Sequence, residues 1–262
     1  MQLSRFGAPL GATVEGVDVR TLADADWQRI NDWFCEYHVL VFPEQQLEPE
    51  DQMAFARRWG QLVRHPYAGM DDYPEIIRLK NVGKRRDVNQ HWHTDMSYNA
   101  APPKLTMLYA LEAPEIGGDT AFANQQLAYA ALSDGLKATL SGMQAQHTAR
   151  GLAGIYGENP DQAPSAVHPV VRTHDETGEA ALYVCRAFTD RFVGWSRQES
   201  AALLEYLYQH SVRPEFQARH RWRRRDLVMW DNRCLLHFAV HDHADDQQRL
   251  IHRLQVEGST TH

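Results

Sequence analysis

The sequence predicts a mainly β protein with a smaller number of helices, in the α+β class. Short apolar runs bounded by Gly or Pro recur along the chain, as in Val39-Leu40-Val41-Phe42 before Pro43, and such runs are typical of buried strands. Fewer segments have the three-to-four-residue apolar spacing of an amphipathic helix. With 262 residues and no internal repeat or low-complexity linker, the chain is predicted to form one domain over residues 1–262, with about ten strands and three or four helices.

The first third of the chain is expected to alternate strands and helices. Residues 3–20 alternate apolar and small residues around glycines, which predicts short strands joined by a turn. A helix is expected from Asp24, a suitable N-cap, because apolar residues then recur on one helical face from Trp27 to Tyr37. Three further elements are expected here: a strand over 39–42, a helix from Pro49 to Gly60 and a strand over 75–82.

The rest of the chain is expected to contain most of the strands. They are predicted over 104–111, 167–173, 181–184, 216–222, 227–230 and 249–256. Helices are predicted over 127–140, with a break near Ser133, and after the capping box from Ser196 to Glu199. Residues 148–166 lack periodicity and contain Gly, Pro, Asn and Asp, so we expect a mobile active-site loop there.

Charge and composition argue against several classes of partner. The formal net charge of -7 does not favour nucleic acid, and the basic run 219–225 is expected to be the solvated face of a hairpin. No apolar run approaches the roughly 20 residues that span a bilayer, and the N-terminus lacks the apolar segment of a signal peptide. The three cysteines are widely spaced, without a disulfide or zinc pattern. We therefore expect a cytoplasmic protein without membrane partners.

A candidate metal site is centred on His93 and Asp95. If this segment is a strand, the two side chains point the same way. His237 follows a hydrophobic strand and an Asp-Asn turn, and would complete the two-histidine, one-carboxylate set that leaves three positions open on Fe(II). Zinc with three ligands would more often be hydrolytic. Because the chain has 14 histidines, spacing alone does not separate a metal site from a chance arrangement.

Two arginines near the end of the chain suggest anion binding. In a strand, Arg249 and Arg253 share one face with Ile251, and their side chains start roughly 13 Å apart. That separation suits two different anions on either side of a metal, because guanidinium groups bind carboxylates and sulfonates through paired hydrogen bonds. Two solvent-exposed arginines on an edge strand are the alternative.

Four motifs in this order resemble a known family. They are Trp92-His93-Thr94-Asp95, Gly117-Gly118-Asp119-Thr120, Trp230-Asp231-Asn232-Arg233 with His237, and the segment from Arg249 to Arg253. Together they resemble the Fe(II)/2-oxoglutarate-dependent dioxygenases typified by taurine dioxygenase and 2,4-dichlorophenoxyacetate dioxygenase. The resemblance covers nearly the whole chain. It implies a double-stranded β-helix, or jelly roll, flanked by helices.

The resemblance also implies roles for individual residues. His93, Asp95 and His237 would bind Fe(II), and Thr120 with Arg249 would bind the distal carboxylate of 2-oxoglutarate. Arg253 would face the anionic group of the primary substrate. The remaining substrate-pocket positions are implied for His65, Asn89, Met96, Tyr98 and Phe188. A hydrogen bond from Asp231 or Asn232 to His237, or a plain turn, is expected at the Asp-Asn pair.

The implied reaction is the hydroxylation of a small anionic organic substrate, such as a sulfonate, sulfate ester or aryloxyalkanoate. It is coupled to the conversion of 2-oxoglutarate and O2 to succinate and CO2. A zinc-dependent hydrolase with the same three ligands is an alternative, although it gives no reason for Thr120 and Arg249. A non-catalytic jelly-roll binding protein is another. A homo-oligomer, either a dimer or a tetramer, is expected.

Overall fold

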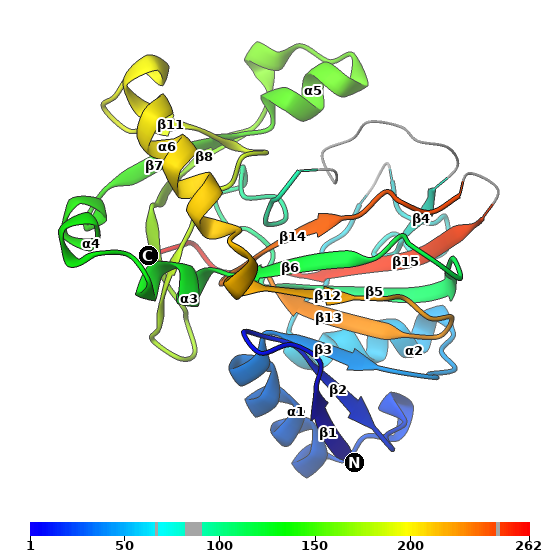
Figure 1. Ribbon diagram of the computed structural model, residues 1–262. Coiled ribbons are helices and arrows are strands. Elements are labelled where there is room, and N and C mark those ends of the chain that lie inside the picture. The colour runs from blue at the N-terminus through cyan, green and yellow to red at the C-terminus, as the bar shows by residue number, and fades with distance from the viewer. Residues whose placement is uncertain (66–67, 82–90, 245–246) are drawn as a thin grey trace.

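The largest element of the protein is a seven-stranded sheet, shown in Figure 1 as a computed structural model that describes residues 1–65, 68–81, 91–244 and 247–262. In spatial order its strands are β1 (Gln2–Arg5), β2 (Ala12–Glu15), β3 (Val39–Phe42), β13 (Leu227–Asp231), β5 (Leu105–Glu112), β15 (Arg249–Val256) and β4 (Ile77–Asn81). Neighbouring strands are antiparallel, except that β2 and β3 are parallel.

A smaller sheet packs on one face of this large sheet. Its strands, in order, are β12 (Gln217–His220), β6 (Thr120–Asn124) and β14 (Leu235–Ala239). Val228 and Trp230 of β13 share an apolar cluster with Phe122 of β6 and Leu235 of β14, so the two sheets enclose a common core. This pair of facing sheets is the jelly-roll core that the resemblance implied.

The opposite face of the large sheet is covered by helices. Because side chains alternate along a strand, Leu227 and Met229 of β13 point away from the small sheet. They join Phe34 of α1 (Asp24–Tyr37) and Phe55 of α2 (Pro49–Ala56) in a second apolar cluster. The 3-10 turns η1 (Val19–Thr21) and η2 (Arg57–Trp59) flank these helices. The strands between the two layers are therefore buried on both faces.

A block of smaller elements, on the left and at the top of Figure 1, comes from the chain between β6 and β12. Its strands are β7 (Gln144–Thr148), β8 (Ser165–Pro169), β9 (Val171–Thr173), β10 (Ala180–Leu182) and β11 (Thr189–Phe192). Its helices are α3 (Gln125–Ala130), α4 (Asp134–Leu140), α5 (Arg150–Tyr156) and α6 (Arg197–Ser211), with the turns η4 (Pro160–Gln162) and η5 (Pro214–Phe216). The predicted mobile loop 148–166 contains α5 and η4, and its mobility stays a prediction.

Most of the predicted elements are confirmed, with ends that differ by a few residues. The break at Ser133 separates α3 from α4, and the Ser133 hydroxyl accepts from the Leu136 amide as an N-cap. The capping box at Ser196 begins α6. Asp24, however, is the first residue of α1, and Ala23 occupies the N-cap. The described residues contain fifteen strands and six α-helices, more than expected, because many of the strands have only three to five residues.

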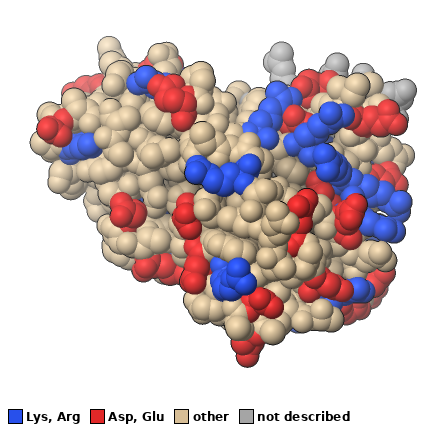
Figure 2. All heavy atoms as spheres, turned by 60° about the horizontal axis from the view of Figure 1, so that its bottom comes forward, with Lys and Arg blue, Asp and Glu red and all other residues tan. Residues whose placement is uncertain are grey.

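One predicted pairing is wrong. The strands on either side of the basic run do not form a hairpin, since β12 pairs with β6 in the small sheet while β13 pairs with β3 and β5 in the large one. The chain crosses from one sheet to the other, and Trp222 is buried between them. The arginines at 221, 223, 224 and 225 are exposed, as expected of a solvated face. Figure 2 shows basic side chains gathered on the right of one face, with acidic side chains beside them.

Membrane insertion through a helix is not supported by the described residues. None of the helices that they form is both long and apolar enough to cross a bilayer.

Candidate active site

Two distant segments bring His93 and His237 together at one end of the small sheet. The His93 amide donates to the His237 carbonyl at 3.1 Å, and the His237 amide donates to the His93 carbonyl at 2.7 Å. The two rings have centroids 4.0 Å apart. His237 lies on β14, whereas His93 forms only an isolated bridge and Asp95 begins a turn. The conditional expectation of a strand at 93–95 is therefore wrong, but the side chains converge.

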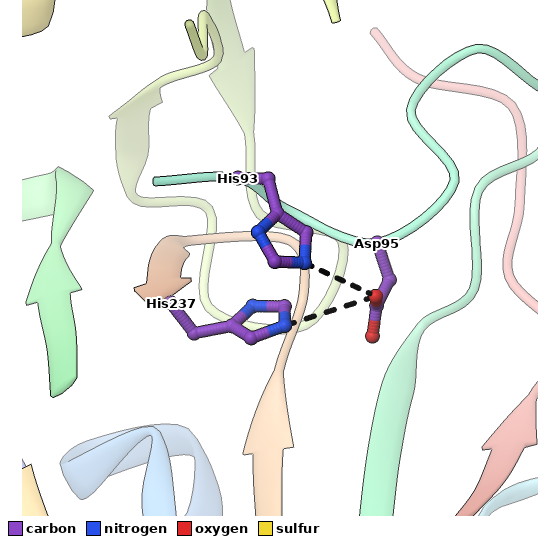
Figure 3. A group of neighbouring side chains, drawn as sticks. All are labelled: His93, Asp95 and His237. Atoms are coloured by element: carbon purple, nitrogen blue, oxygen red, sulfur yellow. Dashed lines mark ion pairs between the residues drawn. The ribbon is translucent and has the colours of Figure 1, made fainter. Parts of the chain in front are cut away.

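The three predicted ligands form a compact, buried group, as Figure 3 shows. Asp95 Oδ1 lies 3.8 Å from His93 Nε2 and 3.7 Å from His237 Nε2. His93 Nδ1 is 2.7 Å from the His91 carbonyl oxygen. Since a carbonyl can only accept, Nδ1 carries the proton and the lone pair of Nε2 faces Asp95. Two imidazole nitrogens and one carboxylate oxygen on one side suit a metal with open coordination positions.

Asp95 is held by two further side chains. The Thr106 hydroxyl on β5 donates to Asp95 Oδ2 at 2.6 Å, and Arg253 Nη2 lies 2.7 Å from Asp95 Oδ1. Burial raises the pKa of the Asp95 carboxyl, but the nearby Arg253 guanidinium opposes this effect, and the pKa lies below its usual range. The carboxyl group is therefore ionised at neutral pH and available to a cation.

The expected hydrogen bond to His237 is absent from the described residues. The Asn232 amide donates instead to Thr106 Oγ1 at 2.9 Å, which in turn orients Asp95. Asp231 pairs with Arg233 and His174, and the described residues provide no partner for His237 Nδ1. Of the Asp-Asn pair, Asn232 alone thus supports the carboxylate ligand through Thr106, because the turn points its side chain at β5 and not at β14.

A cavity of about 300 Å³ opens from the three ligands toward β15 and β4. Its lining includes Thr120, Arg249 and Arg253. Arg249 is buried, and its guanidinium lies over the Trp222 ring, 5.5 Å from the centroid. Burial lowers the pKa of Arg249 to about 10. No hydrogen bond or acidic partner of this guanidinium is present among the described residues, so the cavity exposes a buried cation that lacks an anion.

Thr120 and Arg249 are held by the same side chain. Trp222 Nε1 donates to Thr120 Oγ1 at 3.0 Å, while its ring carries the Arg249 guanidinium. Because the Thr120 oxygen accepts this bond, its own proton is free to be donated to another acceptor. The two predicted cosubstrate residues, which both line the cavity, are thus held by contacts with one side chain, Trp222.

Arg253 lines the 300 Å³ cavity, whereas the four other predicted substrate residues that the structure describes lie outside its lining. Phe188 packs edge-on against the His93 ring with centroids 6.0 Å apart, and Tyr98 lies 5.1 Å from Phe188. Met96 follows Asp95 in the turn with a positive φ of 49°. Burial and the nearby Arg253 lower the pKa of His65. Asn89 lies outside the described residues.

Two residues of the site were missed from the sequence. Thr106 is a polar residue in an otherwise apolar strand, and a buried hydroxyl in such a place needs a partner. Trp222 stands within a basic run, and the charges of its neighbours obscured the alternation that places Ala218, His220 and Trp222 on the buried face. Trp222 could have been found from this alternation, and Thr106 from its hydroxyl in an apolar strand.

Comparisons with known proteins agree on one family. The family model described as "Taurine catabolism dioxygenase TauD, TfdA family" matches residues 2–255. The alkylsulfatase of Acinetobacter baylyi is 34% identical over all of this chain and 86% of that protein. The 2,4-dichlorophenoxyacetate dioxygenase of Cupriavidus pinatubonensis is 35% identical over 86% of this chain and 87% of that protein. A crystal structure of a taurine dioxygenase from Burkholderia xenovorans superimposes with a TM-score of 0.88 at 32% identity, covering 99% of this chain and 92% of the other.

Proposed function

Because this chain belongs to the TauD, TfdA family and is a 2-oxoglutarate-dependent dioxygenase, we propose that His93, Asp95 and His237 hold Fe(II). We further propose that Arg249 and Thr120 hold the distal carboxylate of 2-oxoglutarate. The enzyme hydroxylates a small anionic organic substrate while 2-oxoglutarate and O2 are converted to succinate and CO2. The zinc-dependent hydrolase and the non-catalytic binding protein are therefore set aside.

One observation carries the assignment of the cosubstrate. Arg249 is a buried cation with no anion among the described residues, and it faces a cavity that also contains the three metal-ligating side chains. An ionic group left unpaired in the interior is unfavourable, so such a group is expected to have a ligand. A dicarboxylate that reaches from the metal to Arg249 provides the missing charge. The donor set of two histidines and one carboxylate fits Fe(II).

The residues of the chain bind, orient and exclude water. The Arg249 guanidinium and the Thr120 hydroxyl would both donate hydrogen bonds to one carboxylate of the cosubstrate, and the direction of these bonds is fixed. Trp222 fixes both donors before the ligand arrives, which lowers the entropy lost on binding. Bound Fe(II) would supply the activation of O2 that side chains cannot provide. The buried ligand group keeps bulk water away from this chemistry.

Arg253 is proposed to bind the anionic group of the primary substrate. It lies on the same face of β15 as Arg249, lines the same cavity and is partly exposed to it. The names of two relatives refer to an alkyl sulfate and to an aryloxyacetate, and both compounds carry an anionic group. We propose the same class of substrate here, with His65, Asn89, Met96, Tyr98 and Phe188 as the pocket wall.

The assignment is tested by spectroscopy and by product formation. Anaerobic addition of Fe(II) and 2-oxoglutarate is expected to produce a weak visible charge-transfer band, which Asp95→Ala should abolish. O2-dependent succinate is then measured with alkylsulfonates, alkyl sulfates and aryloxyacetates. Arg253→Ala should raise the substrate KM far more than the KM for 2-oxoglutarate. The absence of both the band and succinate would refute the proposal, and the reverse KM pattern would exchange the roles of the two arginines.

We also propose that the enzyme is a cytoplasmic homo-oligomer, a dimer or a tetramer. All three cysteines are free thiols, which suits a reducing compartment. Val167 of β8, and Val193 and Trp195 just after β11 of the same sheet, are large apolar residues with 40% or more of their surface exposed, and such residues are often covered by another subunit. Analytical ultracentrifugation tests the state directly, and a single monomeric species would contradict it.

A further inference from the structure

The two carboxylate oxygens of Asp95 have different partners. Oδ2 contacts Thr106, whereas Oδ1 faces both the two histidines and Arg253. We infer that Arg253 competes with the metal for Asp95 Oδ1, and that an anionic substrate relieves this competition by drawing Arg253 away. Substrate anion and metal would then each strengthen the binding of the other. This inference rests on the proposed function, because it assumes that His93, Asp95 and His237 are the metal ligands.

The competition follows from the contacts of the carboxylate. Oδ2 accepts from the Thr106 hydroxyl at 2.6 Å, and Thr106 is itself fixed by Asn232 at 2.9 Å and Gln255 at 3.2 Å. Oδ1 is the atom that faces both imidazole nitrogens, and it is also the atom that Arg253 approaches to 2.7 Å. A metal between the three ligands therefore needs the oxygen that the guanidinium holds.

The release follows from the position of Arg253. Asp95 is its only acidic partner within the ranges that the structure describes, and its side chain is 21% exposed and lines the cavity. An anion that enters this cavity therefore reaches the guanidinium. An anionic substrate group would supply the second partner, so the guanidinium would exchange part of its ion pair with Asp95 for an ion pair with the substrate.

The size of the effect is set by one ion pair, between Arg253 Nη2 and Asp95 Oδ1. A close ion pair of this kind, like a hydrogen bond to a charged group, corresponds to roughly a 10-fold to 100-fold change in an equilibrium constant. Binding coupling is reciprocal, so the factor by which an anion tightens metal binding equals the factor by which metal tightens anion binding. We therefore expect Arg253→Gln to tighten binding of the metal alone by at least tenfold.

Isothermal titration with Co(II), at pH 8 on the metal-free full chain, tests this without any turnover. At that pH free histidines are neutral. Wild type, Arg253→Gln, Arg253→Lys and Lys80→Gln are compared. Lys80 lines the same cavity but has no ion pair with Asp95 among the described residues, so Lys80→Gln controls for general cavity charge. Arg253→Gln should bind Co(II) at least tenfold more tightly than wild type, while Lys80→Gln and Arg253→Lys should stay within about threefold.

Methanesulfonate provides the second arm of the experiment. It should tighten Co(II) binding severalfold in the wild-type chain and leave Arg253→Gln unchanged. If methanesulfonate still tightens Co(II) binding in Arg253→Gln, the sulfonate contacts the metal directly and the inference is overturned. The inference is also overturned if methanesulfonate does not change Co(II) binding in the wild-type chain. If Arg253→Gln does not fold, the wild-type response and Arg253→Lys still decide. Failure of the wild-type chain to bind one Co(II), or binding that survives Asp95→Ala, would instead refute the proposed metal site.

Discussion

Replacing Arg249 with Met should raise the free energy of unfolding of the metal-free chain and, at the same time, raise the KM for 2-oxoglutarate. Burial lowers the pKa of this guanidinium from its ordinary 12.5 to about 10, a difference that corresponds to roughly 3 kcal/mol. Both values lie far above neutral, so this unfavourable term is fully present at pH 7 and is relieved only as the pH rises through 10. Met keeps much of the side-chain volume against Trp222. We expect Arg249→Met to raise the free energy of unfolding by about 2 kcal/mol.

The same substitution removes the partner of the cosubstrate carboxylate. Loss of one partner of a buried, hydrogen-bonded charge pair weakens binding by about 2–5 kcal/mol, so the KM for 2-oxoglutarate should rise at least 30-fold. Urea unfolding of the metal-free chain and succinate formation measure the two effects.

Arg253→Met is the matched control, because Arg253 already has an anion in Asp95. Its removal leaves a buried carboxylate without its cation, and the free energy of unfolding should fall. A destabilised Arg249→Met, or an unchanged KM for 2-oxoglutarate, would refute the reasoning.

Three further predictions concern the ligand turn and its supports. Asp95→Ala should abolish succinate formation, and activity restored by added Fe(II) would show that the ligand is wrongly assigned. Thr106→Val frees one oxygen of Asp95 and should weaken Co(II) binding roughly 10-fold to 100-fold, measured by calorimetry. His147 on β7 supports the turn that contains Asp95, because its Nδ1 lies 2.9 Å from Ser97 Oγ. Burial and the nearby His168 lower the pKa of His147 to about 3, so between pH 6.5, its ordinary pKa, and pH 3 only the unfolded chain binds this proton. Lowering the pH from 6.5 to 5 should therefore destabilise the wild-type chain more than His147→Gln, by about 2 kcal/mol in the free energy of unfolding. Urea titrations at the two pH values measure this difference, and the same pH profile for both chains would contradict the prediction.

Local patterns in the sequence were sufficient for much of the fold. Alternation in the last strand placed Arg249, Ile251 and Arg253 on one face, and β15 has that arrangement with Arg249 and Ile251 buried. Helix signals such as the capping box at Ser196 act within a few residues and are reliable for that reason. These features depend on residues close in the sequence and not on which strands pair with each other in the sheet.

Pairing between distant segments was harder to predict. The strands before and after the basic run were expected to form a hairpin because they are adjacent in sequence, yet burial of Trp222 sends them to different sheets. The contact of Arg253 with Asp95 joins segments far apart in the chain, and no local period encodes it. The resemblance named both residues but gave the arginine only a substrate role.

The reciprocal backbone hydrogen bonds between His93 and His237 have a practical consequence. Because these bonds are made by the backbone and not by the rings, we expect them to keep the two ring-bearing segments together when the metal is removed. A chain stripped by a chelator should keep its near-ultraviolet circular dichroism and recover when metal is returned, without a refolding step. Amide exchange at these two positions should accordingly be among the slowest in the protein.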